Sequence, residues 1–471
     1  MATDTHGNAV TVANLDSVTL YDQALDHLLH FRPEVSPSLE TLITQDPRCV
    51  MGQVAAVYLG ILGTEPADTA TARSDLTAVE SSIDVDSILP RERMHLAAAH
   101  SLVHGDLHAG GAMLRNLSVE HPRDALALAV GHQIDFFTGD ASTLRDRVGG
   151  ALSAWTADDP HYAQMLGMYS FGLEECGMYS RAEDAGLESV ERDPSDVWGI
   201  HAVAHTLEMQ GRISEGLSYL DEHASDWQQG NYLNVHNAWH YCLYLMDSGD
   251  FERPLSIYDA VLNNAESAGL AMEMLDAAAL LWRMYLEGQD QTARWTVLAD
   301  SWTQTMKEPL YAFNDMHAVM SFVGAGRVAE AERLVESRER YVAKSTDPSV
   351  TNIVITKEIG LPVDRALIAF GKGDYVTTLD LLQPIRYSLP SFGGSHAQRD
   401  AVQRTILEAA LRSDRHDIAR TLLSERLAAN PCSPYGWLKQ AALARAVGDA
   451  VSATTSEARL VELRATSAAR T

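Results

Sequence analysis

The chain has 471 residues, of which 46% are hydrophobic and 21% are charged. This apolar content excludes an intrinsically disordered protein, and a chain of this length buries a large core without disulfides or metal staples. Acidic residues outnumber basic ones by 64 to 36, and the resulting net charge of -28 disfavours nucleic acid and anionic membranes as partners.

The cysteines and the N-terminal sequence indicate the compartment. The four cysteines lie far apart and form no C-x-x-C motif, which favours free thiols in a reducing compartment. The N-terminal residues lack the basic start and the apolar stretch of a signal peptide. No stretch approaches the roughly 18 consecutive apolar residues of a membrane span. We therefore expect a cytoplasmic protein that does not enter a membrane.

Taken in chain order, the predicted elements are almost all helices. Residues 19–31 and 49–62 have helical patterns, and Asp46-Pro47 lies between them as a plausible repeat end. Ala, Leu and Met then recur at helical spacing over residues 93–103 and 198–209. The one run with strand character, residues 352–356, is short and flanked by helical pattern. The sequence therefore predicts an all-α chain.

A short turn recurs along the chain, and it begins at Gly105, Gly139, Gly177, Gly211, Gly249, Gly288, Gly326, Gly373, Asp414 and Gly448. Several of these steps are 34 residues, the period of the tetratricopeptide repeat. Five residues after the turn comes a small residue suited to a close helix crossing, as at Ala182, Ala293, Ala331, Ala419 and Ala453. Seventeen residues after the turn, three repeats have a proline that ends a helix: Pro122, Pro194 and Pro431.

This pattern predicts a tetratricopeptide-like solenoid of helix pairs that stack into a right-handed superhelix. We expect irregular helices over residues 1–90 and helix-pair repeats over residues 91–345. Further repeats over residues 346–471 should continue the solenoid.

Histidines give the clearest functional signal. His201 and His205 lie four residues apart and share one helix face, which Glu208 extends by a turn. In the next repeat, His236 and His240 have the same spacing. In tetratricopeptide domains the corresponding first-helix positions line the concave groove, and packed helices lie about 8–10 Å apart. We therefore expect the four imidazoles to converge on one hollow.

Two further histidines occupy groove positions: His95 near the N-terminus, and His317, which has Asp315 beside it as a further carboxylate. Three interpretations of the cluster stay open. Neutral imidazoles predict a divalent metal site, Zn or Fe, formed by the four clustered histidines. Alternatively, His205, His240 and Glu208 act as general acids and bases on a small molecule. In the third, the histidines are packed groove residues or bind an acidic peptide.

Residues 393–400, GGSHAQRD, form a second candidate. Ser395 is a good N-cap, which places His396, Arg399 and Asp400 on the first turn of a helix. A helix N-terminus with an arginine favours an anion, so this turn either caps a helix or contacts a substrate carboxylate or phosphate. The other candidate ligand contacts are Arg283, Trp239 and Trp282.

Five segments together resemble the tetratricopeptide repeat protein 38 family: HAVAHTLEMQGR (201–212), HNAWHYCLYLMDSGDF (236–251), LLWRMYLEG (280–288), FNDMHAVM (313–320) and GGSHAQRD (393–400). The resemblance implies an all-helical repeat fold and a soluble intracellular protein, and it implies no particular reaction.

Two functions are therefore expected. In the first, a His-lined concave pocket binds a small polar or anionic ligand, with or without a divalent metal. The alternative is a scaffold that binds a protein or peptide in the groove. A closed pocket favours the first and an open groove the second, while enzymatic activity and the oligomeric state stay open.

Overall fold

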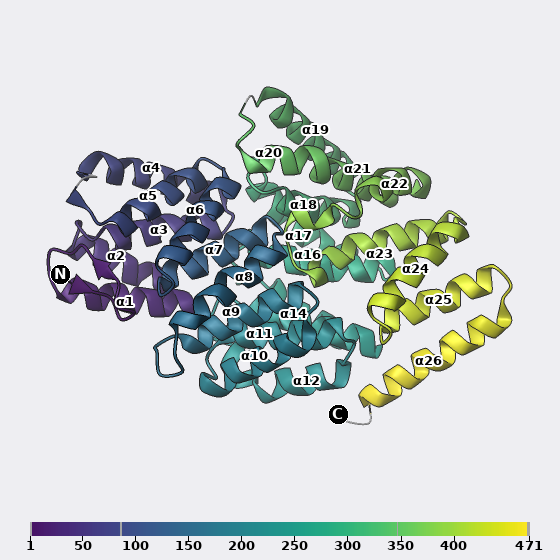
Figure 1. Ribbon diagram of the computed structural model, residues 1–471. Coiled ribbons are helices and arrows are strands. Elements are labelled where there is room, and N and C mark those ends of the chain that lie inside the picture. The colour runs from purple at the N-terminus through teal and green to yellow at the C-terminus, as the bar shows by residue number, and fades with distance from the viewer. Residues whose placement is uncertain (1, 85–86, 346, 469–471) are drawn as a thin grey trace.

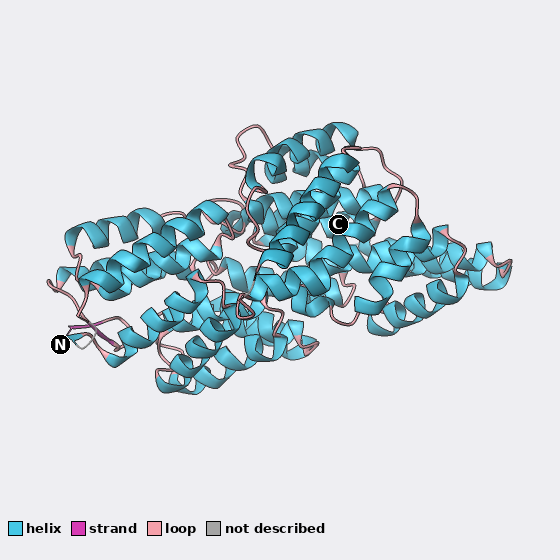
Figure 2. Cartoon of the chain, turned by 90° about the horizontal axis from the view of Figure 1, so that it is seen from above, coloured by secondary structure: helices cyan, strands magenta, loops and turns pink. Residues whose placement is uncertain are grey.

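The computed structural model describes residues 2–84, 87–345 and 347–468, and this part of the chain is almost entirely helical (Figure 2). The exception is a small hairpin of β1 (Ala2–Thr3) and β2 (Ala9–Val10), which pair antiparallel with Ala2 opposite Val10. Within these ranges no helix combines the length and the apolar character needed to cross a membrane. The predicted all-α class is confirmed.

The helices follow one another in pairs along the chain (Figure 1). From the N-terminus they are α1 (Asp16–Leu29), α2 (Val35–Gln45), α3 (Val50–Leu62), α4 (Pro66–Ser82), α5 (Pro90–Val103), α6 (Leu107–Glu120), α7 (Ala125–Phe137), α8 (Ala141–Ala151), α9 (Tyr162–Glu175), α10 (Tyr179–Arg192), α11 (Val197–Met209), α12 (Ile213–Glu222) and α13 (Ala224–Trp227). The later ones are α14 (Asn234–Ser248), α15 (Arg253–Ile257), α16 (Ala271–Leu286), α17 (Thr292–Thr305), α18 (Ala312–Gly324), α19 (Val328–Lys344), α20 (Thr351–Ile355), α21 (Leu361–Gly371), α22 (Tyr375–Leu382), α23 (His396–Arg412), α24 (His416–Ala429), α25 (Pro434–Ala446) and α26 (Ala450–Ala468). Short 3-10 or π segments are η2 (Leu152–Ala154), η3 (Tyr258–Leu262), η4 (Thr356–Gly360), η5 (Gln383–Ile385) and η6 (Leu389–Phe392).

The recurrent turns share one backbone geometry. The first residue of each has a positive φ, from 57° at Asp414 to 98° at Gly249, a region that glycine enters without steric cost. The next residue donates its N–H to a carbonyl five positions earlier, as Arg212 does to Leu207 at 2.9 Å, and this bond closes the first helix of the pair. The protein is therefore a tetratricopeptide-like helix-pair solenoid, as the spacing predicts.

The close helix crossings follow the predicted small residues with one exception. Ala182, Ala331 and Ala419 are fully buried. Ala293 is exposed, so the prediction is wrong there, because the turn before α17 is longer and shifts the helix register. Trp295 takes the crossing position instead and lies against Gly324 of α18, where a Cβ would come within 2.3 Å of the indole. The small residue at this crossing is thus on the facing helix.

The run with strand character, residues 352–356, forms no strand. It lies in α20 and at the start of the π segment η4. The Asn352 side chain accepts a hydrogen bond from the N–H of Ala312 at 2.9 Å and so fixes the start of α18. These tertiary contacts outweigh the β propensity of the valine and isoleucines.

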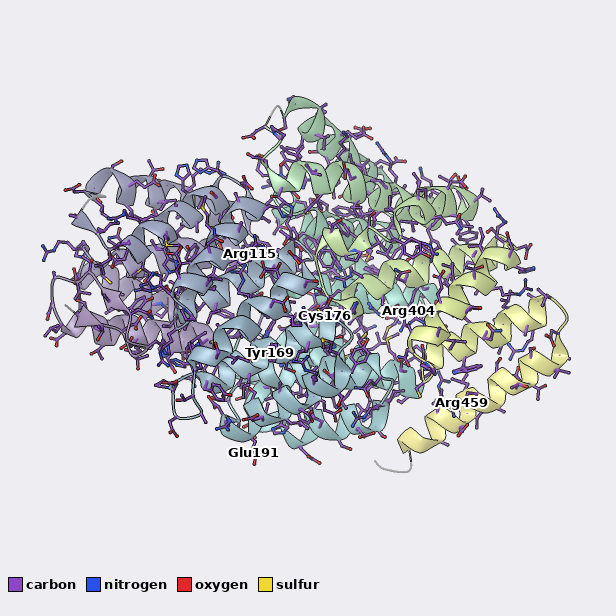
Figure 3. The ribbon with its side chains drawn as sticks, viewed as in Figure 1. Arg115, Tyr169, Cys176, Glu191, Arg404 and Arg459 are labelled. Atoms are coloured by element: carbon purple, nitrogen blue, oxygen red, sulfur yellow. The ribbon has the colours of Figure 1, made fainter. Side chains whose placement is uncertain are left out.

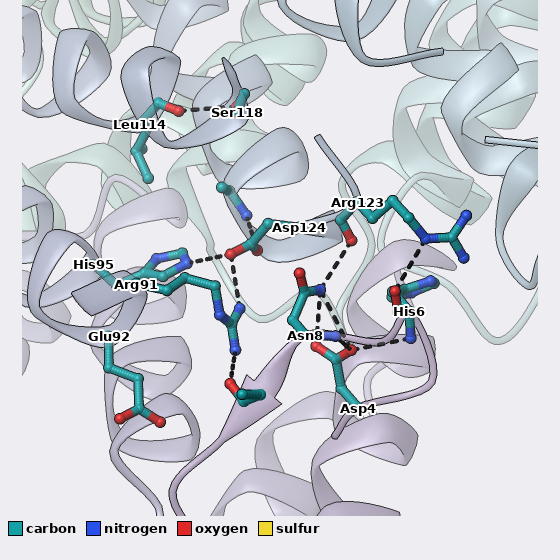
Figure 4. Close-up of polar contacts among 12 residues, drawn as sticks. Asp4, His6, Asn8, Arg91, Glu92, His95, Leu114, Ser118, Arg123 and Asp124 are labelled. Atoms are coloured by element: carbon teal, nitrogen blue, oxygen red, sulfur yellow. Dashed lines mark hydrogen bonds and ion pairs between the residues drawn. The ribbon is translucent and has the colours of Figure 1, made fainter. Parts of the chain in front are cut away.

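The N-terminal hairpin is fastened to the repeats by a buried ionic cluster (Figure 4). Asp124 caps α7 and receives Arg91 at 2.7 Å and the Nε2 of His95 at 2.9 Å, while Arg91 also donates to the carbonyl of Ala9. His95 therefore binds Asp124 in this ionic cluster and does not line a hollow with the other histidines.

The superhelix closes on itself, because helices far apart in the sequence touch (Figure 1). Helix α23 packs on α16 and α11, and α26 returns to contact α12 and α14. The N–H of Leu107 donates to the hydroxyl of Thr351 at 3.0 Å, which joins α6 to α20. Helices of distant repeats thus contact one another across the superhelix.

A buried histidine cluster as candidate metal centre

Two neighbouring helices carry the histidine cluster. Helix α11 presents His201 and His205, and α14 presents His236 and His240, each pair on one face. The ring centroids lie 4.2 to 6.5 Å apart across the two helices. One nitrogen from each ring lies within 4.8 Å of the other three. The fold therefore brings these imidazoles to one point.

The cluster is buried and its hydrogen bonding is incomplete. His201, His205 and His240 are at most 1% exposed, and the side chain of His236 is 16% exposed. Both ring nitrogens of His201 and His205, and the Nε2 of His240, are buried without a hydrogen-bond partner. Each buried polar atom without a hydrogen-bond partner destabilises the fold by about 1–3 kcal/mol. The five nitrogens together would therefore cost about as much as the whole net stability of a typical protein, about 5–15 kcal/mol. The residues fit a ligand that binds several lone pairs at once.

Carboxylates orient the rings from outside. The Nδ1 of His240 lies 2.7 Å from Glu208, and the Nδ1 of His236 lies 2.8 Å from Asp276. A proton held on each Nδ1 by its carboxylate leaves Nε2 as the free lone pair, which is the arrangement of metal-binding histidines. Glu174 faces the Nδ1 of His205 at 3.8 Å, which is beyond hydrogen-bond distance.

The electrostatics favour neutral imidazoles. Burial, together with the neighbouring rings, holds the pKa values of His201, His205 and His240 well below the usual range. Burial raises the pKa of Glu208 to about 7. Near neutral pH the three histidines are therefore in the protonation state that binds metals.

The tryptophan and arginine candidates divide into two groups. Trp239 belongs to the cluster, because its ring stacks on His236 with centroids 5.3 Å apart, and the Arg283 guanidinium lies 5.3 Å from the Trp239 ring centre. Burial lowers the pKa of Arg283 to about 10. Trp282 points elsewhere and donates its indole N–H to Thr405 at 2.9 Å, which links α16 to α23.

The structure places His317 and Asp315 in other contacts. The Nδ1 of His317 lies 2.8 Å from the carbonyl of Phe313 within α18. Asp315 is buried against Arg338, with Nη2 to Oδ1 at 2.7 Å. The buried Asp315–Arg338 pair connects α18 to α19 and gives the carboxylate a partner of its own.

The anion expected at the start of α23 is a side chain of this chain. Ser395 caps the helix as predicted. The N–H of His396 donates to Glu175 at 2.7 Å, and Arg399 donates to the same carboxylate at 2.9 Å. Asp400 pairs with arginines of α23 and α24, including Arg404. Figure 3 labels Cys176, which follows the last residue of α9, and Arg404 in α23.

Several residues that contact the cluster are not predicted as site residues from the sequence. Phe171 and Trp198 pack against His201 with ring centroids 5.2 and 4.8 Å away. Trp198 in turn packs against His132, which is buried with both nitrogens unpartnered. Asp276 is missed as well, and its position in the otherwise apolar stretch of α16 is a signal that could have shown it.

No family model matches the chain. Among solved structures, a human IFIT1 dimer with PPP-AAAA is 10% identical over 96% of this chain and 95% of that one, with a TM-score of 0.41. The Cut9 and Hcn1 hetero-tetramer of APC/C is 14% identical over 96% of this chain and 94% of that one, with a TM-score of 0.26. At these values neither likeness bears on what the chain binds.

Proposed function

We propose that this solenoid is a metal-binding protein in which His201, His205, His236 and His240 hold one divalent transition metal, Zn or Fe. The observation that supports the proposal is the convergence of one nitrogen from each ring within 4.8 Å. Zn–N bonds of about 2.0–2.1 Å place tetrahedral ligand nitrogens about 3.3–3.4 Å apart. The four nitrogens, which lie within 4.8 Å of one another, would move closer together on binding the metal.

The surrounding charges favour a cation over the small anionic ligand that the sequence also predicts. Glu208, Asp276 and Glu174 all lie behind the rings. In their ionised form, which a bound metal would favour, these carboxylates stabilise a cation and repel an anion. In this proposal His205 and His240 are metal ligands and Glu208 orients one of them, so general acid–base catalysis is not required of these three residues.

Metal analysis of the purified full-length chain tests the proposal, before and after reconstitution with Zn²⁺, Fe²⁺ or Mn²⁺. We expect about one metal per chain. The double variant His205→Ala/His240→Ala should lose it and keep its helix content, because the stability of a solenoid is spread over many repeat interfaces. The matched control is His100→Ala/His104→Ala, an exposed pair with the same spacing. A wild type that stays metal-free after reconstitution would contradict the proposal.

A scaffold function is the second candidate, and one feature favours it. An open hollow of about 460 Å³ lies between α6 and α8, and residues of both helices line it, including Arg115, Val119 and Asp146. Val119 is 77% exposed at its rim. A peptide partner would bind in this hollow, where Val119 offers it an exposed apolar contact. Val119→Asp should then weaken cross-linking to the partner, and the double histidine variant should not.

We also propose that the chain belongs to the tetratricopeptide repeat protein 38 family, on the five segments that resemble it. A cytoplasmic location is supported by its four cysteines, which are all free thiols. We retain the division into residues 1–90, 91–345 and 346–471 as part of this proposal.

A further inference from the structure

A second group of ligating side chains lies at the N-terminal end, away from the four clustered histidines. Asp26 and His30 lie one turn apart at the end of α1, and His161 precedes the first residue of α9. One possible ligand atom from each of the three lies within 4.8 Å of the others. Two histidines and one carboxylate are a common donor set for first-row divalent metals.

The spacing of these atoms suits a small metal ion. The Oδ1 of Asp26 lies 3.1 Å from the Nε2 of His161 and 3.3 Å from the Nδ1 of His30. Ligands about 2.0–2.1 Å from a tetrahedral metal lie about 3.3–3.4 Å from one another. The Nδ1 of His30 also lies 2.8 Å from the backbone carbonyl of Asp26, and a bound metal would replace that contact.

Outer contacts hold the three ligands in place. The Nε2 of His30 lies 3.0 Å from Asp193 and keeps its proton there, so a metal at Nδ1 would displace the proton that Nδ1 now shares with the carbonyl of Asp26. Arg32 donates to the Oδ2 of Asp26 at 3.0 Å, so the guanidinium occupies one carboxylate oxygen and leaves Oδ1 to the cluster.

The other ring nitrogen of His161, Nδ1, contacts a further histidine, His6. This Nδ1 lies 3.2 Å from the Nε2 of His6, whose carbonyl accepts a hydrogen bond from Arg123, as Figure 4 shows. The Nδ1 of His6 is buried without a partner. When the one proton of this contact is on the Nδ1 of His161, the Nε2 lone pair of His161 is left for a metal.

Access also differs from the first cluster. His30 and His161 are largely buried, but the Asp26 side chain is 36% exposed. A metal could therefore reach the three ligands from solvent and keep a position open to water.

We propose that Asp26, His30 and His161 form a second metal site, which takes a first-row divalent cation with two imidazoles and one carboxylate. It is independent of the site formed by the four clustered histidines, because the two share no residue.

Titration of the full-length chain with Co²⁺ and Zn²⁺ in the His205→Ala/His240→Ala background tests the second site without the first. We expect about one equivalent to bind, with Co²⁺ giving the visible absorption of a low-coordinate site. Asp26→Asn should weaken binding by more than about 100-fold, because loss of an outer-shell partner alone costs about 10–100-fold. Glu34→Gln, which removes an exposed carboxylate close in the sequence, is the matched control and should bind as the background does.

His161→Asn is the second test variant. His161 has a φ of 64°, and asparagine tolerates this left-handed conformation, so the start of α9 should keep its shape while the imidazole is lost. We expect the same weakening as for Asp26→Asn, at unchanged helix content. Unaltered binding in both variants, or no binding in the double-histidine background, would overturn the proposal. Either result leaves the first metal site to be judged on its own stoichiometry in the wild type.

Discussion

Replacing His201 by leucine should stabilise the metal-free protein. His201 is almost fully buried, and neither of its ring nitrogens has a hydrogen-bond partner. Leucine is of comparable size and has no polar side-chain atom, so the variant avoids two unsatisfied groups that cost about 1–3 kcal/mol each. A change of side-chain shape in a packed core costs up to about 1.5 kcal/mol. The net gain in the free energy of unfolding at pH 7 should therefore lie between about 0.5 and about 6 kcal/mol.

The gain should grow in acid. In the folded protein, burial and the neighbouring imidazoles hold the pKa of His201 well below its ordinary value of about 6.5. Below that pH the unfolded chain therefore binds a proton that the folded chain does not, and the wild type loses about 1.4 kcal/mol per pH unit. From pH 7 to pH 5 the loss is about 2 kcal/mol, which the variant avoids. The carboxylates near the cluster titrate in both proteins, so their effect largely cancels in the difference.

Urea unfolding followed by far-UV circular dichroism, with a chelator present, measures both effects at pH 7 and pH 5. The matched control is His132→Leu, because His132 is also buried without partners and burial lowers its pKa to about 3. This control should show the same stabilisation and pH dependence and keep the metal, whereas His201→Leu should lose the metal. A difference between wild type and His201→Leu that stays constant from pH 7 to pH 5 would refute the assignment of a buried neutral imidazole.

Three further predictions concern single contacts. Glu208→Gln should lower metal affinity by about 10–100-fold in calorimetric titration, and equal affinity would show that the carboxylate does not orient its histidine. Gly324→Ala should cost about 1–3 kcal/mol in urea unfolding because its methyl meets the indole of Trp295, and Trp295→Phe in that background should recover part of the loss. Arg399→Met should cost up to about 3–5 kcal/mol, because it removes the arginine partner of the buried Glu175 and leaves only its contacts with His396; a loss below about 1 kcal/mol would contradict this role of the ion pair.

The fold was largely predictable because its signals are local. A turn that needs a positive φ selects glycine, and the helix that follows begins a fixed number of residues later, so the spacing of Gly177 and Gly211 shows a repeat directly. The spacing of the neighbouring turns predicts the turn at Asp414 as well, although its first residue is not glycine. The register failed at Ala293, where a longer turn leaves no mark in the residues that follow it.

The site was only partly predictable, for a related reason. The positions of His201 and His205 on one helix follow from spacing alone, and the next repeat places His236 and His240 opposite. The partner of Arg399 could not be inferred in this way, because Glu175 lies 224 residues earlier and meets it only when the superhelix closes. Contacts between distant repeats depend on the curvature of the whole stack, which no local pattern records.

Glu174 and Glu175 connect the contact between α9 and α23 to the four clustered histidines, because Glu175 binds Arg399 and Glu174 faces His205. Burial and the neighbouring Glu175 raise the pKa of Glu174, which faces His205. Although burial acts to raise the pKa of Glu175, the Arg399 and His396 charges bring it below its usual value. A cation held by the four histidines would favour the ionised form of Glu174, and His396, 3.4 Å away on α23, would then gain a charged partner. Metal binding at the four histidines and the contact between α23 and α9 should therefore stabilise each other through Glu174.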